Sequence, residues 1–174
     1  MSTKTERLII EFDRRGHPLG RIIKAEEVPE LIEALRRRLG CTAEELDLSP
    51  ESLKRLEARL IALHQAVEEG QVPMDDEETM RLMREVTAYL GQVMVVNLNG
   101  EWDEQPPGIW PGMVWIPRPI EVIKGETVNT SPRRGFVATH TAAYFWDIIG
   151  TGREKGFLWK QYNMMTEKRW RERL

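Results

Sequence analysis

The chain has 174 residues, of which 41% are hydrophobic and 30% are charged. This length and composition predict one globular domain over residues 1–174 with its own buried core, and they exclude a disordered chain. The net charge of -3 gives the whole molecule no strong attraction to nucleic acid or to a membrane surface.

The first residues lack the apolar run of a signal peptide, and no stretch is long and apolar enough to span a membrane. Cys41 is the only cysteine, which excludes an internal disulfide and suits a reducing compartment. We therefore expect a cytoplasmic protein with no membrane partner.

The first 40 residues predict short strands followed by a helix. Residues 8–12 and 21–24 are runs rich in β-branched side chains around a Gly/Pro turn, which predicts a hairpin. The alternative is one strand and an irregular lead into the next helix. Pro29 then suits a first helical turn, and Gly40 suits the end of that helix.

A short turn and an amphipathic helix follow. The segment Thr42-Ala-Glu-Glu45 matches a capping box, and Ser49-Pro50 is a helix start signal. Apolar residues then recur at helical spacing up to Val67, and Gly70 and Pro73 end the pattern. The sequence therefore predicts a helix over residues 49–69.

Residues 76–98 form the most apolar part of the chain and predict a central, buried helix behind the acidic segment 75–78. Residues 93–98 also fit a strand, because β-branched side chains crowd there and Gly91 is a helix breaker. We favour the helix, with Asn99-Gly100 as its end. A glycine inside a helix then predicts that another element approaches Gly91 closely.

Three segments carry a resemblance: Leu46-Asp-Leu-Ser-Pro-Glu-Ser-Leu-Lys-Arg-Leu56, Ala88-Tyr-Leu-Gly-Gln-Val93 and Asn99-Gly-Glu-Trp102. They resemble a group of small, uncharacterised bacterial cytosolic proteins with the pattern L-D-x-S-x-x-S-L, A-Y-L-G-E-V and G-G-x-W. The chain departs from it at Gln92, where the group has Glu, and at Asn99, where it has Gly. The resemblance covers residues 46–103 and implies an α+β fold whose Tyr-Leu-Gly helix leads into a strand. It implies no known activity.

The second half of the chain predicts a small sheet and two helices. Residues 113–116 and 120–124 are predicted as short strands, and the prolines between them either confine these strands to edges or split them at a bulge. Residues 129–134 are predicted as a loop, residues 135–149 as a helix, and residues 153–172 as a C-terminal helix. The predicted fold is thus α+β, with a helical N-terminal half packed on a small antiparallel sheet and completed by C-terminal helices.

Three residues of the predicted 135–149 helix are the candidates for chemistry. His140, Tyr144 and Asp147 share one helix face, and such a row can transfer protons. A small hydrolase based on His140 and Asp147 is therefore one functional hypothesis. A histidine bonded to a neighbouring side chain is the simpler interpretation, since no nucleophile motif accompanies the row. No metal-ligand spacing occurs, so we expect neither a metal nor another cofactor.

The chain holds six tryptophans, five of them after residue 105. Aromatic anchors dominate the energetics of interfaces, so we name Trp102, Trp110 and Trp170 as candidate binding residues. Trp115 and Trp146 are predicted to lie in the core. The leading hypothesis is a non-catalytic protein-binding protein, of an adaptor or immunity-like kind, whose partner is another protein.

The segment Lys168-Arg-Trp-Arg-Glu-Arg-Leu174 interleaves cations with one aromatic residue. Such a segment can bind a nucleic-acid backbone, which makes nucleic-acid binding a further alternative. Cations at the negative end of a helix dipole explain it as well, and two glutamates dilute it. We therefore do not expect a nucleic-acid partner.

Overall fold

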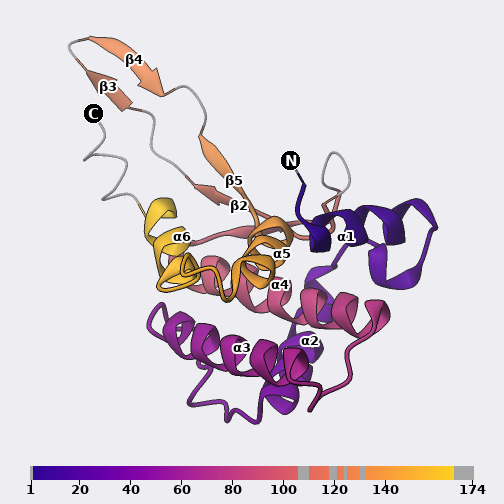
Figure 1. Ribbon diagram of the computed structural model, residues 1–174. Helices are drawn as coiled ribbons and strands as arrows, with labels where there is room; N and C mark the ends of the chain where they lie inside the picture. The colour runs from indigo at the N-terminus through magenta and orange to yellow at the C-terminus, as the bar shows by residue number, and fades with distance from the viewer. Residues whose placement is uncertain (1, 106–109, 118–120, 124, 130–131, 167–174) are drawn as a thin grey trace.

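The computed structural model describes residues 2–105, 110–117, 121–123, 125–129 and 132–166 (Figure 1). One long helix, α4 (Asp76–Leu98), lies at its centre. In the view of Figure 1, helices α2 (Val28–Leu39) and α3 (Ser52–Glu68) lie below α4, whereas α1 (Lys4–Arg14), a three-stranded antiparallel sheet and the later helices lie above it. The fold is α+β, as the sequence predicts.

Helix α4 is a single helix through residues 93–98, so the strand alternative for that segment is wrong. Asp75 caps its start by accepting the backbone N–H of Glu78 at 2.8 Å, and Asn99 ends it in a left-handed conformation with φ 54°. Its middle is buried on every side, which is the arrangement expected of a helix packed between two layers. Among the described helices, none combines the length and the apolar character needed to cross a membrane.

Helix α2 (Val28–Leu39) confirms the signals at its two ends. Helix α3 (Ser52–Glu68) begins three residues after the predicted start at residue 49, although the Ser49 hydroxyl accepts the backbone N–H of Ser52 at 3.2 Å. Pro29 lies in the first turn of α2, and Gly40 ends it with φ 63°. The capping box at residues 42–45 forms, with both hydrogen bonds present. The hydroxyl of Tyr89, on α4, lies 2.5 Å from that of Ser52 and ties α3 to the central helix.

The hairpin predicted from residues 8–12 and 21–24 is wrong, and so is the single-strand alternative. Residues 4–14 form helix α1 (Lys4–Arg14), whose start has a complete capping box between Thr3 and Glu6. Its buried residues recur at helical spacing, at Thr5, Ile9 and Phe12 among others. The later run follows the short helix η1 (Pro18–Gly20) and makes one extended contact, from Ile23 N to Pro111 O at 2.7 Å. Another short helix, η2 (Ala25–Glu27), then leads into α2.

The sheet has the order β1-β2-β5 and is antiparallel throughout. Its strands are β1 (Glu101–Asp103), β2 (Met113–Pro117) and β5 (Arg133–Val137). The strand predicted at 113–116 is confirmed, but its predicted edge position is wrong, because β2 pairs with β1 on one side and with β5 on the other. The predicted 129–134 loop is wrong at its end, and the predicted 135–149 helix at its start, because residues 133–137 pair with β2 as a strand.

The segment between β2 and β5 carries a second antiparallel pair, β3 (Glu121–Ile123) and β4 (Glu126–Asn129). In Figure 1 this pair lies at the end of an arm that projects away from the helices. Strand β3 confirms the prediction for the described part of residues 120–124, whereas β4 was not predicted.

Two helices complete the described chain. Helix α5 (Ala138–Ile148) packs on α4 and α1, and α6 (Phe157–Met165) packs on α3. Glu57 of α3 accepts the backbone N–H of Leu158 at 3.2 Å and so caps the start of α6. The predicted 153–172 helix is therefore shorter at its start, since residues 153–156 are not helical, and its last residues lie outside the described part.

Candidate functional site

The contact between α1 and α5 brings together the residues that the sequence singles out for chemistry. Asp147, in the last turn of α5, accepts hydrogen bonds from the backbone N–H of Thr5 at 2.7 Å and from the Thr5 hydroxyl at 2.6 Å. Thr5 lies in the first turn of α1 and is buried. Both oxygens of the Asp147 carboxylate are therefore engaged in holding the start of α1 against α5.

His140, near the start of α5, also has a carboxylate partner on α1, but not the predicted aspartate. Its Nδ1 atom lies 2.6 Å from Oε1 of Glu6, and the other Glu6 oxygen completes the capping box of α1. The imidazole lies near Tyr144, with ring centroids 6.3 Å apart, and it meets Trp110 edge-on at 5.4 Å. The two ends of the predicted row on α5 therefore bind different residues of α1.

A buried carboxylate beside a half-exposed imidazole can orient that ring for proton transfer. Glu6 is 4% exposed, and the His140 side chain is 52% exposed, so one side of the ring faces solvent. A catalytic site also needs a space for substrate and a group that attacks it. The polar cleft beside α1 is lined by Asp147, and His140 is not among its lining residues. The pair therefore has a clear structural role in docking α1.

That cleft has a volume of about 410 Å³ and opens where α1, α3, α4 and α5 meet. Its wall carries both signs of charge, from Lys4, Arg7, Glu11, Glu68, Asp76 and Asp147. The His64 ring meets Trp146 edge-on at 4.8 Å, and Trp146 is buried as predicted. This mixture of charges selects no single class of ligand.

Within the part of the chain that the structure describes, no three His, Cys, Asp or Glu residues are placed to hold a metal ion. Cys41 is partly buried, and this burial raises the pKa of its thiol. Because the thiolate is the nucleophilic form, Cys41 is poorly suited to covalent chemistry.

The three candidate binding tryptophans differ in their surroundings. Trp102 is 9% exposed and packs its ring against Gly91 of α4, while its Nε1 donates to Oε1 of Gln92 at 3.0 Å. It therefore belongs to the core and offers no binding surface. Trp110 is half-buried beside His140. Trp170, with the basic segment around it, lies outside the described residues.

Trp115 lies on the surface of the sheet and not in the core, which corrects the sequence-based prediction. Strand alternation turns Val114 and Ile116 inward, and both are buried, so the indole between them points outward. The outward-pointing residues of the three strands form what we call the outer sheet face. They are Glu101, Asp103, Met113, Trp115, Pro117, Arg133, Gly135 and Val137.

The Trp115 indole is half-buried at the centre of this outer sheet face. Its Nε1 donates to Oδ2 of Asp103 at 2.7 Å, and the Arg133 guanidinium lies 4.4 Å above its ring centroid. Gly135, opposite Trp115 in register, leaves room for the Met113 side chain and the indole to lie flat against β5. The result is an aromatic side chain with an anion at the Nε1 edge of its ring and a cation over the face of the ring.

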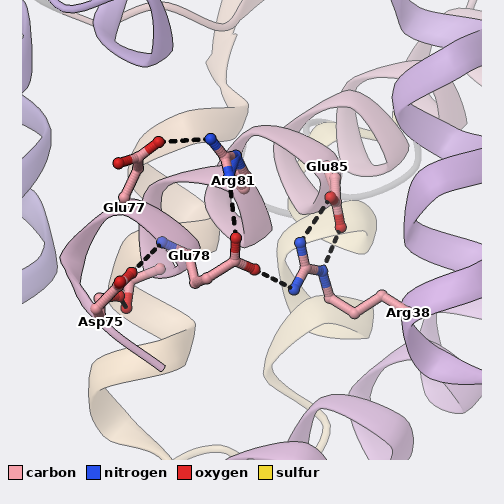
Figure 2. Close-up of polar contacts among 7 residues, drawn as sticks. Arg38, Asp75, Glu77, Glu78, Arg81 and Glu85 are labelled. Carbon is pink, nitrogen blue, oxygen red and sulfur yellow. Dashed lines mark hydrogen bonds and ion pairs between the residues drawn. The ribbon is translucent and has the colours of Figure 1, made fainter. Parts of the chain in front are cut away.

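A second cluster of charges, between α2 and α4, is structural (Figure 2). Arg38 donates two hydrogen bonds to Glu85, at 2.7 and 2.9 Å, and a third to Glu78 at 3.1 Å. Arg81 pairs with Glu77 and Glu78 on the solvent side. Hydrogen bonds from Arg38 to Glu85 raise the pKa of Arg38, so this cation stays charged. Because these charges satisfy one another, the cluster locks two helices together and leaves no site for a ligand.

Replacing Asp147 with alanine is expected to lower the free energy of unfolding by about 2 kcal/mol, because two hydrogen bonds to a carboxylate are lost. The amides of α1 should also exchange hydrogen faster, since Thr5 loses its anchor. Hydrogen exchange measured by mass spectrometry on residues 4–14 checks this.

Glu68→Ala is the matched control, because Glu68 is a carboxylate in the wall of the same cleft, whereas the two hydrogen bonds that anchor Thr5 are made by Asp147. It should leave both stability and exchange in α1 unchanged. An Asp147→Ala variant with wild-type stability and wild-type exchange would contradict the anchoring role and strengthen the catalytic hypothesis for Asp147.

Comparisons with models of known families, with curated proteins and with solved structures found no match to this chain. The case for function therefore rests on the residues themselves.

Proposed function

We propose that this chain is a non-catalytic, cytoplasmic protein-binding protein, and that it binds its partner through the outer sheet face. The observation that carries the proposal is the half-exposed indole of Trp115, set between Asp103 and Arg133. Tryptophan and arginine are the residues most enriched among those that dominate binding energy at protein interfaces.

The shape of this surface favours a protein over a small ligand. The outer sheet face is an array of side chains spread over three paired strands, with an open hollow at its β1 edge beside Glu101 and Asp103, whereas small-molecule sites are concave and bury most of their ligand. Charged residues at its margins, Glu101 and Arg133, surround apolar Met113 and Trp115. An apolar centre within a polar rim is the usual anatomy of a protein interface.

Two features support the non-catalytic and cytoplasmic parts of the proposal. The acid and base named from the sequence, Asp147 and His140, each bind α1 and so have structural roles. A lone, partly buried thiol at Cys41 suits a reducing compartment. A hydrolase remains the second candidate, now with Glu6 as the carboxylate that orients His140, because that pair is only 2.6 Å apart.

The test is capture of partners from the native cell with tagged protein. Trp115→Ala should lose the captured proteins, because it removes the proposed anchor, and Trp110→Ala tests the neighbouring candidate. Trp159→Ala is the matched control: Trp159 is also half-exposed and lies under a cation, Lys54, at 4.6 Å, but on α6. Capture that is equal for wild type, Trp115→Ala and Trp159→Ala would contradict the proposal.

A further inference from the structure

Charge is distributed across the outer sheet face in a definite order. The edge strand β1 presents two carboxylates, Glu101 and Asp103, the central strand β2 presents Met113 and Trp115, and the other edge strand β5 presents Arg133. Read across the sheet, the face therefore runs from acidic through apolar to basic.

The charged side chains that flank Trp115 lie close to one position along the strands. Glu101 lies directly opposite Trp115 in the β1–β2 register. Arg133 lies opposite Pro117, but its guanidinium leans over the Trp115 ring, 4.4 Å from the centroid. The backbones of the two edge strands lie about two strand spacings, or about 10 Å, apart, and the cation on β5 reaches back over the indole between them.

Such a face is complementary to itself. A two-fold axis that runs along β2, between two copies packed face to face, places β1 of each copy over β5 of the other. Glu101 of one copy then approaches Arg133 of the second, and the reverse pair forms by symmetry. Each Arg133 guanidinium lies over its own Trp115 ring, between that ring and the other copy. This is the arrangement required of an isologous dimer interface.

We propose that the partner of the outer sheet face is a second copy of this chain, in a face-to-face dimer about an axis along β2. The proposal rests on the proposed protein-binding function and names its partner. Charge along the sequence supports it: residues 1–105 hold 14 basic and 22 acidic residues, a net -8, and residues 106–174 hold 11 basic and 6 acidic, a net +5. Opposite charge on the two halves favours association between copies.

Other occupants fit the face less well. A nucleic acid would meet the β1 carboxylates as well as Arg133, and like charges repel. Addition of a strand to the outer edge of β5 is disfavoured by Pro132 and by the adjacent charges of Arg133 and Arg134, which are residues that protect edge strands from pairing. A partner is therefore expected to bind on the outer sheet face itself and not along the edge of the sheet. Since the face spans three short strands, we expect a weak and reversible dimer.

The test is sedimentation equilibrium of the purified full chain up to about 1 mM, the dissociation constant of a weak complex. The wild-type chain should form dimers that dissociate on dilution. Glu101→Lys and Arg133→Glu should each weaken dimerisation by at least about tenfold, because each creates two like-charge pairs per dimer. Arg37→Glu, on the exposed side of α2, is the matched charge-reversal control and should have no effect.

An equimolar mixture of the Glu101→Lys and Arg133→Glu variants should dimerise again. In that heterodimer the lysine introduced in one chain faces the glutamate introduced in the other, and the native Glu101 faces the native Arg133, so both pairs are attractive. Mixing cannot restore dimers if a substitution acts only by disturbing the fold of its own chain. Recovery of dimers in the mixture therefore shows that residues 101 and 133 meet between copies. Circular dichroism of each variant confirms that it is folded.

A wild-type chain that stays monomeric throughout would overturn the dimer. So would variants that dimerise like wild type, or a mixture that does not recover. The proposed function is tested separately from the dimer. If a monomeric chain captures other proteins and this capture depends on Trp115, the outer sheet face is still a binding surface, but its partner is not a second copy.

Discussion

Replacing Gly91 with alanine is expected to destabilise the protein by about 3 kcal/mol, the upper end of the usual cost of overpacking a core. A Cβ atom at residue 91 would lie 2.1 Å from Cη2 and 2.5 Å from Cζ2 of Trp102. The ring has little room to retreat, because Trp102 is 9% exposed, its Nε1 is bonded to Gln92, and its strand is paired with β2. The gain in helix propensity, about 1 kcal/mol, is smaller than this cost.

Urea denaturation of the two proteins measures the effect. A double-mutant cycle provides the control, because Trp102→Leu removes the ring that alanine would meet. In the Trp102→Leu background, Gly91→Ala should cost less than in the wild type or even stabilise. An equal cost in both backgrounds, or a stabilised single variant, would show that the helix and the indole do not pack as closely as described.

Much of the helical part of the fold is local and therefore predictable. Pro29 and Gly40 bound α2, and Asp75 and Asn99 bound α4, because caps and breakers act within a few residues of where they stand. The close neighbour predicted for Gly91 is confirmed as well. In each case the deciding residues are adjacent in sequence to the feature that they decide.

The sequence-based predictions of secondary structure were wrong where a local pattern fitted two structures, or where pairing with a segment distant in sequence determined the structure. Residues 8–12 are rich in β-branched side chains, yet the capping box of Thr3 and Glu6 starts a helix there, and that signal was readable from the sequence. Residues 133–137 contain two arginines and a glycine and do not resemble a strand. They form β5 because β2 pairs with them and Trp115 covers Gly135.

For the candidate site, the sequence predicted the residues on α5 but not their partners on α1, because those partners are distant in sequence. Helical spacing placed His140 and Asp147 on α5, but their partners, Glu6 and Thr5, come from the other end of the chain, and Thr5 and Asp147 are 142 residues apart. No local pattern could indicate those contacts. The outward position of Trp115 was available from the alternation of β2, where Val114 and Ile116 are the inward pair.

The largest effect expected from loss of a polar side chain is that of Glu85→Ala, which should lower the free energy of unfolding by about 3 kcal/mol. Glu85 is buried on α4 and accepts two hydrogen bonds from Arg38, on α2, in a bidentate pair (Figure 2). Its removal leaves a partly buried guanidinium whose remaining described carboxylate partner is Glu78. Because Glu78 still pairs with Arg38, the expected loss of stability is near the lower end of the range for breaking a buried ion pair.

Glu77→Ala is the matched control, since Glu77 belongs to the same network but pairs with Arg81 at the surface. Exposed pairs contribute little, so this variant should lie within about 0.5 kcal/mol of wild type. The Glu85 effect should also persist at high salt, because burial limits screening. Replacing both partners, as Arg38→Met with Glu85→Leu, should recover most of the loss, since the cost lies in an unpaired charge and not in the absence of the pair. Equal effects of Glu85→Ala and Glu77→Ala would mean that the contact between α2 and α4 depends on its apolar residues alone.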